Sequence, residues 1–459
     1  MGERPNHFLL VTLPMQGHIN PTLQFAKRLL RTGAQVTFAI SFSAYRRLMK
    51  SSTPIHGLTF APFSDGFDDG YRVFFDEPSE FKLRASQALA DLILAASKEH
   101  RPVTCLIYTL LLSWAADVAN NLGVASALLW IQSAAVFDIY YHYFNGFREL
   151  IANSEDDPLS SIELPGLPRL TSQDVPSFLL PSNFLPLAVP GFQEQFQSFE
   201  RETKIQVLIN TFDAMEPEAL GAIDKINMIG IGPLIPSAFL DDEDPSDKSF
   251  GGDLFHGSGD YIEWLNSKPD SSVVYVSFGS LAVLQTEEIA NGLLESGRPF
   301  LWVIRLNRNE TGEETMLGRW EELKERGLIV PWCTQVEVLS HSSVGCFVTH
   351  CGWNSTLESL VAGVPVVTLP QISDQTTNSR LIEDVWRTGV RTKVKTEEGI
   401  VESGEIKRCL DLVMGSESGN EMTRNVKKWK EMSKEAVKDG GSSDKNLKRF
   451  LEEIVMTGI

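Results

Sequence analysis

One short stretch limits the possible folds of this chain more than any other, because it joins an apolar strand to a polar turn and a helix. Residues 344–349 (VGCFVT) are apolar and β-prone, which predicts a buried strand. Residues 350–356 form a polar turn, and residues 357–362 are typical of a helix. Gly363 stands where a glycine often ends a helix, and Pro365 prevents its continuation. The unit predicts a strand that leads into a helix at the carboxyl edge of a parallel sheet.

The same polar turn has the chemistry of an anion site. At the carboxyl end of a parallel strand, the free backbone N–H groups and the dipole of the following helix attract negative charge. Gly352 would let the backbone approach a phosphate closely, and His350, Asn354 and Ser355 would add side-chain donors. A simpler interpretation is also open. Ser355 and Glu358 have the spacing of a capping box, in which both side chains serve only the helix terminus.

Apolar, β-prone runs recur along the chain and alternate with helical patterns. The predicted strands cover residues 7–12, 35–40, 58–63, 103–108, 125–130, 205–210, 272–277, 300–305 and 328–330, besides the one above. Such alternation is typical of the α/β class, with helices on both faces of a doubly wound parallel sheet. A chain of 459 residues is too long for one ordinary core, so we expect two domains.

The first strand–helix connection contains a histidine, His18. Asn20 is a good N-cap, Pro21 a good first helical residue, and Gly33 a good end for the helix between them. This predicts that His18 lies on the loop at the carboxyl edge of the sheet, where its ring can titrate. The alternative is that His18 only caps or packs near the helix start.

Composition excludes several classes of partner. The formal net charge of −19 argues against nucleic acid and anionic membranes. Five cysteines without a CxxC pair indicate a reducing compartment and no structural zinc. No secretory signal precedes the first strand, and the longest apolar runs, near residues 105–112 and 125–131, are too short to span a membrane. We therefore expect a cytoplasmic protein, without membrane insertion, and a monomer.

An acidic segment divides the chain. Residues 241–259 are rich in Asp, Pro, Gly and Ser, the composition of a solvated interdomain linker. We therefore place one domain at residues 1–240, a second at 260–440, and a C-terminal helix at 441–459. The apolar residues on one face of that helix are Leu447, Phe450, Leu451, Ile454 and Val455.

Two stretches of the first domain are rich in aromatic residues. Residues 137–144 have them at helical spacing, which is typical of core. Residues 178–199 mix phenylalanines with prolines, including Phe184, so these rings form either core or the lining of an apolar acceptor pocket.

The stretch from Trp332 to Gln375 resembles, over its full length, the signature box of the plant secondary-product UDP-glycosyltransferases. The matching residues are Trp332, Gln335, His350, Gly352, Trp353, Asn354, Ser355, Glu358, Asp374 and Gln375. The resemblance implies the GT-B architecture, in which two Rossmann-like doubly wound domains face each other across a cleft. The N-terminal domain would bind the acceptor and the C-terminal domain the UDP-sugar, while the last helix would pack back on the N-terminal domain.

The resemblance also implies a role for each part of the box. Trp332 would stack on uracil, and Cys333 would contact the edge of the base through its backbone. Gln335 and Glu358 would bind the ribose, since a carboxylate can accept hydrogen bonds from both ribose hydroxyls.

The diphosphate and the sugar would be bound by the middle and the end of the box. The diphosphate would be bound by Ser280, His350, Asn354 and Ser355, with Gly352 at the turn. Their hydrogen bonds would stabilise the negative charge that develops on the leaving UDP. Asp374 and Gln375 would bind the sugar hydroxyls. With Trp353, Gln375 resembles the pattern of members that use glucose, so UDP-glucose is the expected donor. The sequence contains no cluster of acidic residues that would suggest a metal site, so no metal is expected.

His18 has the position of the catalytic base in this family, because residues 14–21 (PMQGHINP) resemble its histidine motif. The base takes the acceptor's proton as the acceptor attacks. The family usually supports it with an aspartate, but Thr109 stands at that position here. Asp117 resembles a structural helix residue of the family and not a shifted partner. His18 should therefore be a weaker base, and an acidic acceptor would need less help.

These observations predict an inverting glucosyltransferase that moves glucose from UDP-glucose to a hydroxyl of a small hydrophobic acceptor, a flavonoid or another phenolic. One alternative is glucose-ester formation on a carboxylic acid. Another is a non-catalytic UDP-sugar-binding protein, which only Thr109 supports. A nicotinamide-dependent dehydrogenase is excluded, because residues 230–233 (GIGP) lack the third glycine and have proline where a helix should begin.

Overall fold

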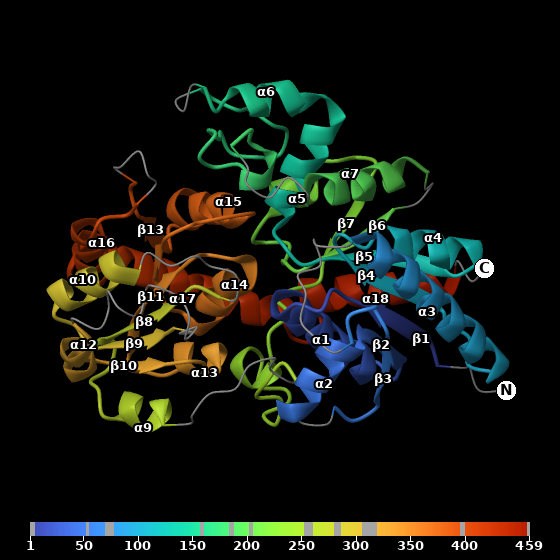
Figure 1. The fold of residues 1–459 in the computed structure, drawn as a ribbon, viewed down its shortest axis with the longest axis horizontal. Helices are drawn as coiled ribbons and strands as arrows, with labels where there is room; N and C mark the ends of the chain where they lie inside the picture. The colour runs from blue at the N-terminus through green and yellow to red at the C-terminus, as the bar shows by residue number, and fades with distance from the viewer. Residues whose placement is uncertain are drawn as a thin grey trace.

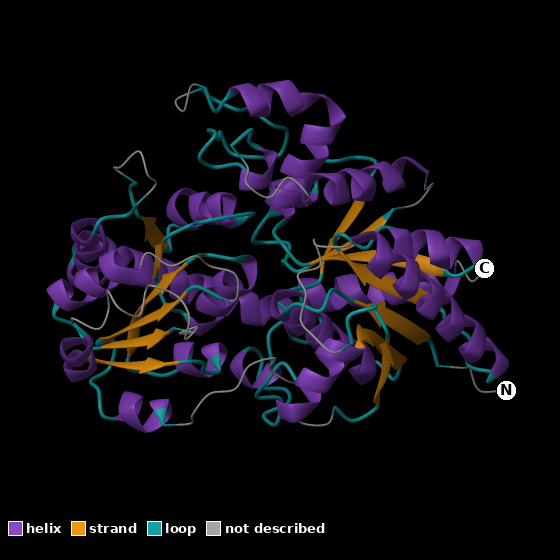
Figure 2. Cartoon of the chain, in the orientation of Figure 1, coloured by secondary structure: helices purple, strands orange, loops and turns teal. Residues whose placement is uncertain are grey.

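The computed structural model describes residues 5–51, 55–68, 78–156, 160–182, 188–201, 205–251, 260–279, 286–304, 319–394 and 400–456. Two parallel sheets, each covered by helices, lie side by side (Figures 1 and 2). The predicted class, two doubly wound α/β domains, is therefore confirmed. We call the part built on the first sheet the first domain and the part built on the second sheet the second domain.

The sheet of the first domain has seven parallel strands in the order β3-β2-β1-β4-β5-β6-β7. The strands are β1 (His7–Val11), β2 (Gln35–Ser41), β3 (Leu58–Phe63), β4 (Cys105–Thr109), β5 (Ala125–Trp130), β6 (Gln206–Ile209) and β7 (Asn227–Gly230). The α-helices are α1 (Gln16–Arg31), α2 (Phe42–Ser51), α3 (Pro78–Lys98), α4 (Trp114–Asn121), α5 (Ala134–His142), α6 (Arg148–Asn153), α7 (Ala188–Ser198) and α8 (Pro217–Leu220). Short helical turns are η1 (Tyr143–Phe147), η2 (Ser177–Leu179), η3 (Phe199–Arg201) and η4 (Ser237–Phe239).

The sheet of the second domain has six parallel strands in the order β10-β9-β8-β11-β12-β13. The strands are β8 (Val273–Ser277), β9 (Phe300–Val303), β10 (Gly327–Val330), β11 (Val344–Thr349), β12 (Val366–Thr368) and β13 (Gly389–Arg391). The helices are α9 (Tyr261–Asn266), α10 (Thr286–Ser296), α12 (Trp320–Arg326), α13 (Gln335–Leu339), α14 (Trp353–Ala362), α15 (Gln375–Arg380), η5 (Leu381–Val385), α16 (Ser403–Gly415), α17 (Glu417–Val437) and α18 (Ser442–Met456).

The strand order reverses direction once in each sheet, between β1 and β4 and between β8 and β11. At such a switch point the connections leave neighbouring strands toward opposite faces, and ligands bind at the carboxyl ends of those strands. His18 follows β1 and Thr109 ends β4, while His350 follows β11. The topology therefore places the predicted base and the predicted diphosphate turn each at a switch point.

Most predicted strands agree with the structure to within two residues, and β3, β5 and β11 agree at both ends. The pattern missed β7, β12 and β13, which are only three or four residues long and give too little periodicity. Gly363 ends α14 in the left-handed conformation with φ of 79°, as predicted. The start of α1 was wrong, because the helix begins at Gln16 and holds Pro21 in its interior.

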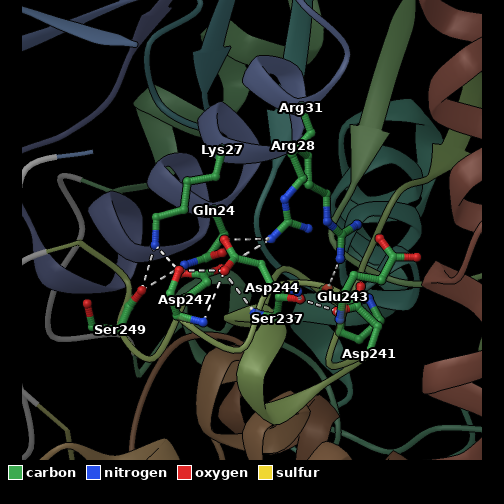
Figure 3. A network of polar contacts seen from close by, with 12 residues as sticks. Gln24, Lys27, Arg28, Arg31, Ser237, Asp241, Glu243, Asp244, Asp247 and Ser249 are labelled. Carbon is green, nitrogen blue, oxygen red and sulfur yellow. Dashed lines mark hydrogen bonds and ion pairs between the residues drawn. The ribbon is translucent and has the colours of Figure 1, made fainter. Parts of the chain in front are cut away.

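The first half of the acidic segment is anchored on α1, although several of its residues are exposed (Figure 3). Lys27 Nζ on α1 lies 2.6 Å from Asp247 Oδ1, and the Asp247 side chain is only 6% exposed. Lys27 Nζ also donates to the carbonyl of Ser249 at 2.6 Å, and Gln24 Nε2 donates to the same carbonyl at 3.1 Å. Because a buried charge is stable only when it is paired, these contacts hold the described part of the segment on α1. Residues 252–259 lie outside the described ranges.

The last helix, α18, returns to the first domain (red in Figure 1). Ser443 Oγ donates to the carbonyl of Gly232 at 2.6 Å, and Asn446 Nδ2 donates to the carbonyl of Gly230 at the end of β7, at 3.0 Å. Of the five apolar residues predicted for one face, Leu447, Phe450 and Ile454 are buried and Leu451 is half-buried. Val455 is 57% exposed and so does not take part in this packing.

The aromatic residues of the two stretches in the first domain pack mainly on one another. Phe192 on α7 stacks on Tyr140 of α5 with ring centroids 4.1 Å apart, and Phe196 contacts Phe137 and Trp130. Phe192 and Phe196 are 1% and 4% exposed. This burial favours the core interpretation for the described rings, whereas Phe184 lies outside the described residues.

Candidate active site

A buried polar cluster joins three residues of the signature box. Gln335, the first residue of α13, donates through Nε2 to Ser355 Oγ at 2.9 Å and to Glu358 Oε2 at 2.6 Å. Ser355 and Glu358 on α14 are 7% and 4% exposed. The capping-box interpretation is wrong, because α14 has Gly352 as its N-cap and Ser355 already lies inside the helix. The structure therefore brings together the side chains expected to bind the ribose and the diphosphate.

Tyr275 on β8 completes this cluster and was not predicted. Its hydroxyl donates to Gln335 Oε1 at 3.2 Å and lies 3.3 Å from Cys333 Sγ. Burial raises the pKa of Tyr275 well above its usual value, so the hydroxyl keeps its proton and remains a donor. Trp332, expected to stack on uracil, is half-buried next to Cys333. Within an apolar strand, Tyr275 looked like any other core residue, so no sequence signal separated it from the core.

Two glycines enclose the ring of His350 at the end of β11. A Cβ added to Gly279 would come within 2.9 Å of His350 Nε2, and one added to Gly352 within 2.7 Å. Both positions therefore need a residue without a side chain. Burial lowers the pKa of His350 to about 4, so at neutral pH the ring is uncharged and offers one N–H donor. Ser280, also expected at the diphosphate, lies outside the described residues.

His18 lies in the first turn of α1 and not on the preceding loop. Its Nδ1 is 3.4 Å from Thr109 Oγ1 at the end of β4, and Thr109 Oγ1 is 3.3 Å from Thr12 Oγ1. Both threonines are at most 1% exposed. Burial lowers the pKa of His18 to about 4, so its neutral, proton-accepting form predominates at pH 7.

No carboxylate takes the place of the missing aspartate in the described part of the chain. Burial is the one cause that shifts the pKa of His18, and the hydrogen-bond partner of its Nδ1 is a hydroxyl. Asp117 is exposed on α4, as expected of a structural helix residue. Thr109 can orient the imidazole but cannot balance the charge that the ring acquires on accepting a proton.

Asn354 joins the diphosphate turn to the helix that contains His18. Its Nδ2 donates to the carbonyl of Gly17 at 2.8 Å, one residue before His18. Pro21 has no N–H, so the Gly17 carbonyl cannot accept the usual helical hydrogen bond from residue 21. The Asn354 amide satisfies this carbonyl from the second domain. A proline inside α1 is therefore tolerated through a tertiary contact, which explains why the predicted helix start was wrong.

The side chain of Trp353 also crosses between the domains. Its indole Nε1 donates to the carbonyl of Asn210 at 2.7 Å, and the residue is 3% exposed. Trp353 therefore joins α14 to the end of β6 in the first domain.

Asp374 and Gln375 lie at the start of α15 and are buried. Gln375 Oε1 accepts from the backbone N–H groups of Gln371 and Ile372 at 2.9 and 3.1 Å, which leaves the Nε2 side of the amide as a donor. Asn378 Nδ2 donates to Asp374 Oδ2 at 2.7 Å. Burial raises the pKa of Asp374, while the hydrogen bond from Asn378 opposes that shift.

Within the described ranges, no group of three His, Cys, Asp or Glu side chains has the arrangement of a metal site. None of the described helices is both long and apolar enough to cross a lipid bilayer.

Comparison with known proteins identifies the family. Residues 257–427 match the model of the UDP-glucoronosyl and UDP-glucosyl transferase family. Phloretin 4'-O-glucosyltransferase from Malus domestica is 59% identical over 472 residues, which cover 98% of each chain. The chain belongs to the plant UDP-glycosyltransferase family. This glycosyltransferase is also 58% identical, over 97% of each chain, to a chloroplastic crocetin glucosyltransferase from Gardenia jasminoides.

A solved structure extends the likeness to the whole fold of this glycosyltransferase. Os79 from O. sativa, in complex with UDP, superimposes with a TM-score of 0.85 at 34% identity and covers 97% of this chain and all of its own. The glycosyltransferase therefore has the GT-B architecture that the resemblance implied.

Proposed function

We propose that this glycosyltransferase moves glucose from UDP-glucose to a hydroxyl of a small apolar plant phenolic, such as a flavonoid, with inversion of configuration. Residues 1–240 bind the acceptor and residues 260–440 bind the donor. One observation carries the proposal: the Asn354 amide joins the donor turn of α14 to the first turn of α1, where His18 lies. The base and the donor site thus have a fixed spatial relation.

In this proposal the second domain holds the nucleotide and stabilises the leaving group. Trp332 stacks on uracil, and Glu358 accepts from the ribose hydroxyls while Gln335 holds it in place. The diphosphate lies beside the uncharged ring of His350 and accepts from the free backbone N–H groups at the start of α14. These donors stabilise the negative charge on departing UDP, and the proposal requires no metal ion.

His18 acts as the general base. Its neutral ring accepts the proton of the acceptor hydroxyl while the oxygen attacks the anomeric carbon from the side opposite UDP, and this single displacement inverts the configuration. A base with a pKa of about 4 gives proton transfer little driving force. Acceptors whose hydroxyl is already acidic, such as phenols, are therefore favoured over aliphatic alcohols.

A relative supports phenolic acceptors, and the surroundings of His18 favour carboxylic acids as a second class. The Malus relative is named for O-glucosylation of phloretin. The second candidate is glucose-ester formation on a carboxylic acid, which the hydroxyl environment of His18 favours, since a carboxylate attacks without losing a proton. We further propose a monomer in the cytosol, in keeping with five cysteines that are all free and buried.

The test is UDP release from UDP-glucose with a panel of phenolics and small aromatic or terpenoid acids, followed by mild alkali. We expect hexosides that resist alkali, because glycosidic bonds to a hydroxyl survive conditions that hydrolyse esters. Products that are all labile to alkali would establish the carboxylic acid instead. Absence of UDP release with every acceptor would favour a protein that only binds UDP-sugars.

A further inference from the structure

The turn that contains Asp374 and Gln375 is hydrogen-bonded to residues 173–177 of the first domain. The backbone N–H of Ser373 donates to Ser177 Oγ at 2.7 Å, and the backbone N–H of Ser177 donates to the carbonyl of Ser373 at 3.0 Å. Ser373 has a φ of 64°, a left-handed conformation that costs free energy for a residue other than glycine. A reciprocal pair of hydrogen bonds from the first domain therefore holds a strained residue immediately before Asp374.

The residues that follow the turn reach the same segment. Thr376 Oγ1 donates to the carbonyl of Val175 at 2.7 Å, and Thr377 Oγ1 donates to the carbonyl of Asp174 at 2.7 Å. These threonines come directly after Gln375 in the first turn of α15. Asp374 and Gln375 are thus flanked on both sides by residues that bond to residues 173–177.

A largely buried ion pair anchors that segment. Arg391 Nη1, at the end of β13, lies 2.8 Å from Asp174 Oδ1, and the two side chains are 19% and 5% exposed. Arg391 also donates to the carbonyl of Gln173 at 2.5 Å. The other carboxylate oxygen of Asp174 accepts from the backbone N–H and the hydroxyl of Thr171, at 2.9 and 2.8 Å. Because every oxygen of this low-exposure carboxylate is bonded, the segment has one well-defined position.

The hydrogen bonds that join the ribose cluster, among the residues that the structure describes, stay within the second domain. Tyr275, Gln335, Ser355 and Glu358 bond to one another, and all belong to the second domain. The two ends of the donor are therefore supported differently. The ribose cluster relies on contacts within one domain, the diphosphate turn contacts α1 through Asn354, and the sugar end relies on residues 173–177 of the first domain.

We propose that residues 173–177 are a positioning element for sugar recognition: they hold the turn of Asp374 and Gln375 in the conformation that selects glucose. This inference rests on the proposed binding of the sugar hydroxyls by these two residues. The acceptor-side domain thereby completes the sugar site, and loosening the segment weakens recognition of the sugar without weakening recognition of UDP.

The test compares Ser177→Ala with Ser182→Ala, a matched change at an exposed serine of the same region. Removing Ser177 Oγ deprives the Ser373 N–H of its acceptor. We expect the KM for UDP-glucose to rise about tenfold, the effect of one lost buried hydrogen bond. The inhibition constant of UDP should stay as in the unmodified enzyme, and the preference for UDP-glucose over UDP-galactose should fall. Ser182→Ala should change none of these values, and Ser177→Thr, which keeps the hydroxyl, should restore the KM.

Two outcomes would overturn the inference. An unchanged KM for UDP-glucose in Ser177→Ala would show that the segment does not position the turn. An equal rise in the KM for UDP-glucose and in the inhibition constant of UDP would show a general loss of donor binding. Should Ser177→Ala lower the melting temperature so far that no enzyme remains, the same measurements on Thr376→Val, which removes a different hydrogen bond to the segment, decide the question.

A separate variant distinguishes failure of the inference from failure of the proposed function. Gln375→Ala should reduce the preference for UDP-glucose by itself. If it leaves that preference unchanged, the assigned role of the turn in sugar binding is wrong, whatever Ser177→Ala does. If Gln375→Ala reduces the preference and Ser177→Ala does not, the turn binds sugar but residues 173–177 do not position it.

Discussion

At the carboxyl end of β1 the enzyme presents a histidine surrounded by hydroxyl groups, whereas at the corresponding end of β11 it presents amides and a carboxylate that bond to one another. Both places are switch points of parallel sheets with the same order of the four central strands. His18 faces Thr109 and has a pKa lowered by burial, while Glu358 is held by Gln335. The topology thus provides one switch point in each domain, and the side chains make one suited to proton transfer and the other to binding a nucleotide.

The contrast also concerns charge. A buried carboxylate is stable when hydrogen bonds satisfy it, and Glu358 has that support. At the first switch point burial lowers the pKa of His18 to about 4, and the hydroxyl of Thr109 beside Nδ1 carries no charge that would oppose this shift, so His18 stays neutral and weakly basic. Three substitutions would break or sharpen this comparison.

The largest effect is expected for His18→Ala. Removing the base should lower kcat by about 10²–10⁴-fold, because proton transfer then depends on water. The KM for UDP-glucose should change little, since the donor cluster lies in the other domain. Steady-state kinetics with a phenolic acceptor measure both values, and His56→Ala, at an exposed histidine, is the control. Full activity in His18→Ala would remove the first switch point from the chemistry.

A smaller effect, on KM and not on kcat, is expected for Glu358→Gln. The amide has the shape of the carboxylate but loses its charge and one acceptor, so the KM for UDP-glucose should rise about tenfold. The kcat at saturating donor should stay close to that of the unmodified enzyme. Glu337→Gln, the same exchange at an exposed position of α13, serves as the control. A change in kcat alone would contradict the assignment of this cluster to nucleotide binding.

The smallest effect, and the sharpest test of the difference in charge, is expected for Thr109→Asp. A carboxylate beside Nδ1 should raise the pKa of His18 from about 4 toward its ordinary value. The unmodified enzyme needs neutral His18, so its rate should fall only as the pH drops through about 4, and in the variant this decline should move to higher pH.

At neutral pH the same variant should gain about threefold in turnover on weakly acidic hydroxyls, and less on carboxylic acids, because a stronger base helps only where a proton must be removed. Thr109→Val, which removes the hydroxyl without adding charge, should instead slow the reaction. An unmodified enzyme whose rate already declines near pH 6.5 would show that a charged group supports His18 after all.

Much of this enzyme was predictable from the sequence because its signals are local. The apolar runs of β5 and β11 gave both ends of each strand, and Gly363 gave the end of α14. The box from Trp332 to Gln375 named most of the candidate site in one contiguous stretch. Two predictions that proved wrong share a cause: the start of α1 and the capping role of Ser355 were judged from neighbours in the sequence alone.

The sequence by itself determined the two α/β domains, the family and the residues that are candidates for the chemistry, since periodicity and contiguous motifs need no knowledge of distant contacts. Only the tertiary structure decided how those residues act together. The Asn354 amide on the Gly17 carbonyl, Tyr275 on Gln335 and the pairing of Ser177 with Ser373 each join residues far apart in the chain. Such contacts leave no local pattern, because a hydrogen bond depends on distance and direction in space and not on spacing along the sequence.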